Sequence, residues 1–480
     1  MRKKFITNLL FLVSLNLLIK PFWIFGIDMT VQNTVGSSEY GFYFALFNFS
    51  LLFNIFLDLG ITNFNNRNIA RHNQLLSKHF SNIIGLKFLL GLLYLIIILI
   101  GAFVIGYNER QIQFLLILAG NQFLLSLIMY MRSNISGIQL FKTDSMLSVL
   151  DRLLMILIVG FLLLNYRSSF KIEWLIYSQS VAYIITSLVA FFILKAKSVG
   201  LTFKFNFKFF LVILRKSYPY ALLVLLMTSY TRIDSVMIER LLPDGNTQAG
   251  IYAHGFRILD ASSQYALLFA TLLLPMFAKM LMNKENIAQL VKVSFLLLVI
   301  PAVVVAVNFS FFRNDIIYVL YNDHIEESAK VFEVLILGFI PISVSYIFGT
   351  LLTANGNLKE LNIMASIGVV LNLTLNFILI PNLKAYGAAL ASLITQFITA
   401  MLQFMIARKV FNFKIRYKLI ISMIIFTAWI ILSGYITDTY ITSRPIAFIT
   451  TLIIGILSAF AFKLIDLKML YQILRYDKTN

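Results

Sequence analysis

The sequence contains no cysteine and is poor in charge and in histidine. Only 13% of its 480 residues are Asp, Glu, Lys or Arg, and 4 are His. The missing thiols exclude disulfides and a thiolate metal site. A soluble domain carries about a quarter charged residues, so this chain lacks the polar surface to cover a soluble core. That shortage excludes a soluble enzyme, a disordered chain and a coiled coil.

What the sequence has in abundance is apolar side chains, at 60% hydrophobic and 15% aromatic residues, with a mean hydropathy of +0.86. A helix needs about 20 mainly apolar residues to cross a bilayer. Fourteen such runs are predicted, at 5–27, 41–62, 81–106, 111–132, 147–165, 173–194, 217–239, 249–278, 290–311, 330–354, 361–381, 385–407, 418–436 and 446–465. The short alternating segments of a β-barrel are not seen. We therefore predict an all-α polytopic membrane protein whose first run is a retained span rather than a cleaved signal peptide.

The distribution of Lys and Arg predicts which side of the membrane each loop faces. With a cytoplasmic N-terminus, 27 of the 40 Lys and Arg residues fall in cytoplasmic segments, 8 in outer loops and five inside spans. Cytoplasmic loops of membrane proteins carry such an excess of cations. We expect both termini in the cytoplasm and a topological origin for most of the net charge of +19.

A short motif that occurs twice indicates two related halves. Tyr40-Gly41-Phe42-Tyr43 begins the second span and Ala249-Gly250-Ile251-Tyr252 begins the eighth. Six spans separate the copies, so the halves should be related by an axis along the membrane normal, as in transporters with two rocking lobes. The predicted organisation is an N-terminal lobe (1–197), a basic cytoplasmic linker (198–214), a C-terminal lobe (215–410), and a final helix pair with a cytoplasmic tail (411–480).

The predicted linker alternates aromatic side chains with lysines in Phe203-Lys204-Phe205-Asn206-Phe207-Lys208-Phe209. Such an amphipathic segment is expected to lie on the anionic cytoplasmic leaflet. Its expected partners are membrane lipids and not nucleic acid.

Five cations fall inside predicted spans, where a charge costs at least about 2.5–3.5 kcal/mol at the bilayer centre. Lys87 and Arg152 lie near cytoplasmic ends, and we expect their side chains to reach the inner headgroups. Lys20, Arg232 and Arg257 lie deeper, at similar depths on spans one, seven and eight. Facing lipid would be costly there, so these three are predicted to line a central cavity between the lobes.

The polar residues of span eight are predicted to share one face of the helix. Its polar residues are spaced 3, 3 and 4 apart, as one column on a helix: His254, Arg257, Asp260 and Gln264. On span seven Asp234 lies two residues from Arg232, so these side chains point to different sides. The alternative is a set of buried ion pairs, Arg257 with Asp260 and Arg232 with a carboxylate on another helix. The excess of cations suits an anionic substrate.

Other residues inside spans are expected to have structural roles. Pro21 should bend or break the first span beside Lys20. Polar residues commonly hold membrane helices together, and we interpret the following in that way: Asn54, Asp58, Asn372, Asn376 and Gln396.

The sequence around these charges resembles a known family. It is similar to the Wzx-type polysaccharide (O-antigen) flippases of the multidrug/oligosaccharidyl-lipid/polysaccharide (MOP) exporter superfamily in Arg232-Ile233-Asp234, Met237-Ile238, Gly250-Ile251-Tyr252 and Arg257. Further similarity lies in Leu57-Asp58-Leu59-Gly60-Ile61, Asn68-Ile69-Ala70-Arg71 and Tyr386-Gly387-Ala388-Ala389. The resemblance covers nearly the whole chain. Gly255 departs from the alanine expected between the Tyr and the Arg.

The resemblance implies two six-helix lobes in a V, as in the MATE transporters, with a C-terminal helix pair. It implies a transporter rather than an enzyme, which moves an undecaprenyl-pyrophosphate-linked oligosaccharide to the outer leaflet of the bacterial cytoplasmic membrane, with no cofactor or metal. A polysaccharide polymerase and glycosyltransferases are expected further partners. The role of binding pyrophosphate and acidic sugars falls on Arg232 and Arg257, with Lys20 added by the charge argument. Asp234, His254, Asp260 and Gln264 are expected to give polar support.

Two other functions stay open. A multidrug or cation antiporter of the same superfamily needs carboxylates deep in the first lobe, where we expect only Asp58 and Asp151, near cytoplasmic ends. A membrane polymerase or glycosyltransferase needs a catalytic outer loop. The longest loop, 312–329, is short for a domain, and its acidic residues could hold a metal but are more typical of a solvated loop: Asp315, Asp323, His324, Glu326 and Glu327. No Walker A or zinc-type His-Glu motif occurs in the sequence.

Overall fold

The computed structural model of the chain describes residues 15, 16, 18–62, 69, 75–197, 207–413, 417–462 and 464, with the backbone alone at 75–79, 81 and 207–217. This part of the chain is almost entirely helical and contains no strand. In chain order the helices are η1 (Phe22–Asp28), α2 (Met29–Leu52), η2 (Asn54–Leu57), α4 (Leu75–Ile105), α5 (Glu109–Gly137), α6 (Phe141–Asn165), η3 (Arg167–Ser169), α7 (Ile172–Lys197), α8 (Phe207–Leu241), α9 (Gly245–Met282), α10 (Ala288–Phe311), α11 (Arg313–Leu320), α12 (Ile325–Leu337), α13 (Phe339–Asn355), α14 (Leu358–Phe411), α15 (Tyr417–Tyr440) and α16 (Arg444–Ala461). The predicted all-α fold is confirmed.

Within the described ranges, 11 helices are long and apolar enough to cross a membrane. One of them, α14, has 54 residues, which is too long for a single crossing. Its backbone leaves the helical conformation at Lys384 (φ 52°, ψ −136°). This break separates two arms that correspond to the predicted spans 361–381 and 385–407. The helices thus follow the apolar runs of the sequence, as expected for a polytopic membrane protein.

The first span differs from the prediction at Pro21 and at its far end. Pro21 does not break the helix but is followed by the π-helical segment η1. Such a widened turn accommodates the N–H group that proline lacks. The helix then continues into α2 and turns back only at Gly36, whose φ of 81° favours glycine. Residues 28–35, predicted to be loop, are therefore helical.

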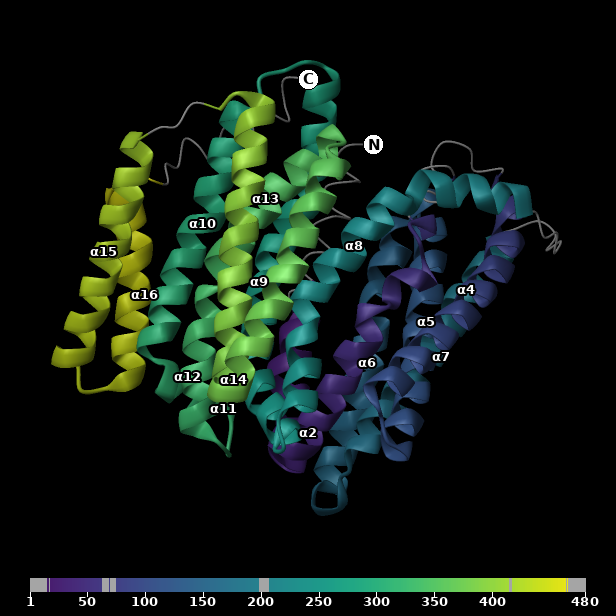
Figure 1. Cartoon of the computed structure of the whole chain (residues 1–480), viewed down its shortest axis with the longest axis horizontal. Coiled ribbons are helices and arrows are strands. Elements are labelled where there is room, and N and C mark those ends of the chain that lie inside the picture. The colour runs from purple at the N-terminus through teal and green to yellow at the C-terminus, as the bar shows by residue number, and fades with distance from the viewer. Residues whose placement is uncertain are drawn as a thin grey trace. The chain divides into compact units, whose positions relative to one another are not determined.

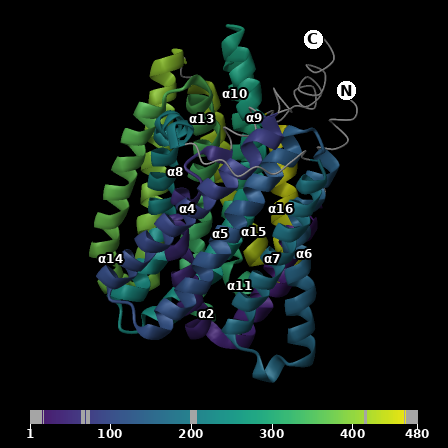
Figure 2. The same cartoon turned by 90° about the vertical axis from the view of Figure 1, so that its right-hand side faces the viewer.

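The chain forms two compact units, Met1–Gly250 and Ile251–Asn480. In the first unit α5 packs along α7, α6 along α7, and α2 along α8 (Figure 1, Figure 2). In the second unit α10 packs against α13, and the α15–α16 pair packs on α10. The predicted lobe boundaries stay a prediction, and residues 198–206 of the predicted linker lie outside the described part of the chain.

The two copies of the Gly-x-Tyr motif meet close to the Gly36 turn. A Cβ atom on Gly41 would lie 1.9 Å from the carbonyl oxygen of Asn246 and 2.4 Å from the amide nitrogen of Gly250. A Cβ atom on Gly250 would lie 2.0 Å from the carbonyl oxygen of Ser37. Only residues without a side chain allow backbones to approach so closely. The repeated glycines are therefore a helix-packing contact of the first unit.

Candidate functional site

The three predicted substrate-binding cations lie within helices and are half-buried. Lys20 directly precedes Pro21, Arg232 lies on α8, and Arg257 lies on α9. Lys20 and Arg232 belong to the first compact unit and Arg257 to the second. Asp234 is buried at 1% exposure, in contrast to its half-buried neighbour Arg232. The structure thus places all three cations inside apolar segments, where each interacts with other groups of the protein.

The polar column on α9 is divided by the packing of the helix. His254 is buried, with its Nδ1 atom 2.8 Å from the Ser328 hydroxyl and its ring stacked on Tyr321 at 3.9 Å. The other members of the column are half-buried: Arg257, Asp260 and Gln264. Three residues advance by about 300° around a helix, so a spacing of 3 and 3 rotates His254 away from Asp260. His254 thus holds α9 against the end of α11 and against α12.

Gly255 has a packing role that explains its departure from alanine. A Cβ atom there would lie 2.9 Å from the Cα atom of Phe332 and 3.2 Å from a methyl carbon of Leu335. Alanine would require the two helices to move apart. Gly255 therefore allows α9 to approach α12 closely, next to Arg257 in sequence.

Sequence reasoning missed a buried carboxylate in the first span. Asp28, at the end of η1, is 2% exposed and accepts hydrogen bonds from the Tyr40 hydroxyl at 2.9 and 3.0 Å. The prediction that only Asp58 and Asp151 lie as carboxylates in the spans of the first lobe is therefore wrong. Residues 28–35 contain neither glycine nor proline, and this signal indicates that the helix continues through them.

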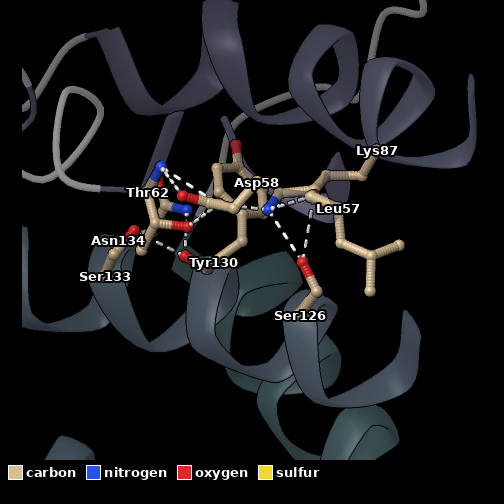
Figure 3. A network of polar contacts seen from close by, with 8 residues as sticks. All are labelled: Leu57, Asp58, Thr62, Lys87, Ser126, Tyr130, Ser133 and Asn134. Carbon is tan, nitrogen blue, oxygen red and sulfur yellow. Dashed lines mark hydrogen bonds and ion pairs between the residues drawn. The ribbon is translucent and has the colours of Figure 1, made fainter. Parts of the chain in front are cut away.

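Lys87 does not reach the headgroups, so that prediction is wrong. Its side chain is 1% exposed and forms an ion pair with Asp58. The Lys87 ammonium also donates to the carbonyl oxygen of Leu57 at 3.0 Å and to the Ser126 hydroxyl at 2.9 Å (Figure 3). All three hydrogens of an ammonium group therefore have acceptors.

This network forms where the helix ends and the chain turns. After α2 and η2 the chain turns through Leu59 and Gly60, with φ angles of 46° and 81°. A helix that ends leaves carbonyl groups without partners in the helix, and Lys87 and Ser126 supply partners for Leu57. Charged side chains at helix C-termini commonly do this. The sequence shows the lysine but not the helix end that binds it.

The surroundings of the network hold helices together. Asp58 accepts hydrogen bonds from the Thr62 amide at 3.3 Å and from the Thr62 hydroxyl. Asn54 donates to the Gln122 side chain at 3.2 Å, which confirms the expected role of Asn54 between helices. Tyr130, drawn in Figure 3, belongs to a buried apolar cluster at this end of the unit: Ile61, Ile69, Phe80, Ile83, Leu86, Leu90, Tyr130, Met131, Ile135, Leu147, Ala190 and Leu194.

At the Gly36 end, an exposed cluster surrounds Arg110. Its guanidinium nitrogens lie 3.1 and 2.7 Å from the carboxylate oxygens of Glu39 and 3.4 Å from Glu173. The guanidinium also lies 4.7 Å from the centre of the Phe42 ring. The cluster joins α2, α5 and α7, with Arg110 at 47% exposure.

A second cluster fastens α8 to the start of α5. Glu239 accepts a hydrogen bond from the Gln111 side chain at 2.7 Å and pairs with Arg240 at 2.6 Å. The Arg240 guanidinium lies 4.4 Å from the centre of the Tyr107 ring. Burial raises the pKa of the Tyr107 phenol, and the Glu239 carboxylate adds to that rise.

The acidic segment 312–329 carries several separate ion pairs. It contains α11 and the first residues of α12, and its charged residues pair in different places: Asp315 with Arg444 at 3.9 Å, Glu326 with Lys330 at 2.8 Å and His324 with Glu327 at 3.7 Å. Among the residues that the structure describes, no three His, Asp or Glu side chains gather in a way that could hold a metal ion.

Comparisons with known proteins agree with this architecture. The family model described as "Polysaccharide biosynthesis protein" matches residues 6–281. No curated protein matches the chain. Among solved structures it is similar to the lipid II flippase MurJ in an inward closed conformation, at 16% identity and a TM-score of 0.71, over 98% of this chain and 99% of that chain.

Two transporters of the MOP superfamily are also similar. An inward-facing multidrug resistance MATE transporter is 15% identical with a TM-score of 0.65, over 81% of this chain and 94% of that chain. A transporter from Pyrococcus furiosus Vc1 (DSM3638) is 16% identical with a TM-score of 0.59, over 85% and 94%. At these identities the similarity shows a shared fold. The chain belongs to the polysaccharide biosynthesis protein family and has the transporter and flippase fold of the MOP superfamily.

Proposed function

We propose that the chain is a flippase that moves an undecaprenyl-pyrophosphate-linked oligosaccharide repeat unit from the inner to the outer leaflet of the bacterial cytoplasmic membrane, for the synthesis of a surface polysaccharide such as O-antigen. The family match over residues 6–281 carries the proposal. The fold supports it, because a flippase of lipid II has the same architecture over nearly the full length of both chains.

The charges inside the helices suit such a cargo. A sugar-pyrophosphate cannot cross hydrocarbon unaided, whereas its prenyl tail can stay in the lipid. We assign binding of the pyrophosphate and acidic sugars to Arg232, Arg257 and Lys20, which are half-buried cations within apolar helices. The forked guanidinium of arginine forms charge-assisted hydrogen bonds with phosphate oxygens. Asp234, Asp260 and Gln264 supply polar support, and His254 holds α9 in position.

Transport is proposed to proceed by alternating access, with both termini in the cytoplasm. The binding residues first accept the pyrophosphate from the cytoplasmic side and then release it outward. With the inside negative, each anionic charge that moves outward is favoured by about 2.3 kcal/mol per 100 mV. A polysaccharide polymerase and glycosyltransferases are the proposed partners that use and supply the lipid-linked glycan.

The site assignment is tested with Arg232→Ala and Arg257→Ala. Both variants should abolish surface polysaccharide. Membrane abundance should stay near that of the native protein, because each substitution removes a half-buried side chain and leaves no cavity in the packed core. Arg167→Ala, at an exposed arginine in η3, is the matched control and should retain full polysaccharide. Full polysaccharide in both test variants would contradict the assignment.

One observation favours a second candidate, a cation antiporter. The buried Asp28 carboxylate, held by Tyr40, is an anionic group deep in the first unit. For an antiporter, Asp28→Asn should abolish export of cationic drugs and leave surface polysaccharide unchanged. For the flippase, deletion of the chain should remove surface polysaccharide and leave drug resistance as it was.

A further inference from the structure

The corner between α8 and α9 is held against the first unit by a small set of polar contacts. We propose that this corner, residues 239–250, is a releasable latch of the transport cycle, and that Gln111 and Glu239 are the positioning residues that keep it closed. The inference rests on the proposed function in assuming a transport cycle. With both termini in the cytoplasm, as proposed, the corner lies on the outer side of the membrane.

The corner belongs to the second half of the sequence repeat but to the first compact unit. The repeat assigns α8 and α9 to the C-terminal half, whereas the compact units divide after Gly250 and leave the corner in the first unit. From Gly250 the same helix, α9, continues into the second unit and carries Arg257. Release of the corner would therefore free the start of the helix that carries a proposed substrate-binding residue.

The charged contact of the latch depends on the orientation of one side-chain amide. Gln111 completes the capping box at the start of α5, where its side-chain oxygen accepts from the Asn108 backbone amide at 2.9 Å. The other end of the same amide, the NH₂ group, donates to a carboxylate oxygen of Glu239 at 2.7 Å. The Glu239 side chain is 7% exposed, and Gln111 is 3% exposed. Hydrogen bonds to an ionised acceptor are stronger than neutral ones, so this contact holds the corner closed.

Arg240 adds weaker contacts between the end of α8 and the turn that joins α4 to α5. Its guanidinium donates to the carbonyl oxygen of Gly106 at 3.4 Å and lies 4.4 Å from the centre of the Tyr107 ring. The Arg240 side chain is 25% exposed. Because water already reaches this guanidinium, water can replace the Gly106 carbonyl when the corner moves.

Two buried polar atoms at the corner oppose the closed state. Within the described residues, neither the Tyr107 hydroxyl nor the side-chain oxygen of Asn246 has a hydrogen-bond partner. A buried polar atom without a partner is costly, since it has lost its hydrogen bonds to water. Separation of the corner from the α4–α5 turn and from α2 would admit water to both atoms. The strong contact of Glu239 is thus opposed by two costs that opening relieves.

The contact between the corner and α2 can also part without rearrangement of side chains. Gly41 meets the backbone of Asn246 and Gly250, and Gly250 meets the backbone of Ser37. Neither glycine has a side chain that could interlock with the opposite surface. The two backbones can therefore separate as rigid pieces.

The absence of cysteine from the sequence allows opening to be measured with a single thiol. In the purified full chain, Ala249→Cys places the thiol at a position of α9 that is 0% exposed, so its reaction with a maleimide at constant pH reports opening of the corner. Glu239→Ala and, separately, Gln111→Leu remove the charged hydrogen bond. Each should raise the labelling rate by about tenfold to a hundredfold, the factor that corresponds to one hydrogen bond to a charged group.

Gln113→Leu is the matched control, because Gln113 is an exposed glutamine on the same helix, where it bonds to Glu109. It should leave the labelling rate unchanged. A rate that Glu239→Ala and Gln111→Leu also leave unchanged overturns the proposal. If Glu239→Ala does not accumulate, Glu239→Gln is used, which keeps an acceptor for Gln111 without the charge and should raise the rate by a smaller factor.

A second thiol distinguishes a latch from a general loss of stability. Ala182→Cys is also 0% exposed but lies on α7 of the same unit, so it is labelled only when the unit itself opens. Glu239→Ala should accelerate labelling at position 249 and leave labelling at position 182 unchanged. Equal acceleration at both positions would overturn the proposal, because Glu239 would then only stabilise the unit.

The two positioning residues are proposed to act through one bond, which a double variant tests. Glu239→Ala with Gln111→Leu should label no faster than the faster of the two single variants, since residues that share an interaction are not additive. Multiplied rates would show that the residues act independently and would overturn their pairing.

These measurements need no lipid-linked substrate. A failed labelling test would overturn the latch and leave the flippase proposal in place. Failure of the flippase proposal would instead show in the leaflet distribution of the lipid-linked glycan, which the labelling does not measure.

Discussion

Two ion-paired sites in the first unit use similar chemistry in opposite surroundings. Arg110, at 47% exposure, makes two bonds to Glu39 and one to Glu173, whereas Lys87 is 1% exposed and pairs with Asp58, which is 26% exposed. Exposed ion pairs contribute about 0–1 kcal/mol to stability. Removal of one partner from a buried pair costs about 3–5 kcal/mol. Burial, and not the number of contacts, therefore decides how much each site matters.

The two sites should also differ in how they respond to the loss of a single charged residue. Each residue of the exposed cluster can be lost on its own, because water solvates the partner that remains. The Lys87–Asp58 pair differs, because loss of the Asp58 carboxylate would leave the Lys87 ammonium as an enclosed cation without its counter-ion.

The largest effect is expected for Lys87→Ala. The substitution leaves the broken helix end and Asp58 without their cation, so the free energy of unfolding should fall by about 3–5 kcal/mol. Membrane abundance and the thermal unfolding of the purified protein measure this loss. Lys330→Ala, at a lysine that is 61% exposed, is the matched control and should behave as the native protein. Equal stability of the two variants would contradict the assigned burial of Lys87.

A substantial effect is expected for Gly41→Ala, which lies next to the exposed cluster but in an uncharged contact. The new methyl group would meet the Asn246 carbonyl oxygen at 1.9 Å, and such overpacking costs about 1–3 kcal/mol. Gly120→Ala on α5 is the control, because no atom lies within 4 Å of its added methyl group. A thermal unfolding temperature for Gly41→Ala at or above that of Gly120→Ala would refute the close contact.

A small effect is expected for Arg110→Ala. Its partners remain accessible to water, so the loss should be at most about 1 kcal/mol and should diminish with added salt. Unfolding at low and high ionic strength measures this dependence. A loss as large as that of Lys87→Ala would break the comparison.

The smallest change in stability is expected when both charges of the buried pair are removed. Replacing a buried ion pair by neutral groups of similar size is often neutral or stabilising. Asp58→Asn with Lys87→Met should therefore unfold close to the native protein, although Lys87→Met alone is destabilised. A double variant less stable than Lys87→Met would show that the two side chains do not act as a pair.

The helical membrane fold could be predicted because it depends on the length of apolar runs. The kink in α14 at Lys384 illustrates this: one 54-residue helix still carries two predicted spans. The depth of Lys87 in the membrane can also be predicted, because residue spacing along a span sets depth. Its pairing with Asp58 cannot be predicted in this way, because the contact depends on where α2 ends and how the chain turns at Leu59.

In the candidate site, too, residue spacing predicts only part of the arrangement. Arg257, Asp260 and Gln264 on α9 are all half-buried. His254 follows the same spacing but is enclosed by Tyr321 and Ser328, since a column of this spacing rotates around its helix. The predicted first span ends at residue 27, which places Asp28 in the following loop. In fact the side chains of Thr30 and Thr34 hydrogen-bond to carbonyls of their own helix at 2.6 and 2.7 Å.

The central claim is tested most directly by the leaflet distribution of the lipid-linked repeat unit in cells that lack the chain. The flippase account predicts that undecaprenyl-pyrophosphate-linked glycan accumulates in the inner leaflet and that expression of the native chain, but not of Arg232→Ala or Arg257→Ala, restores its passage to the outer leaflet. An unchanged distribution after deletion would contradict the account.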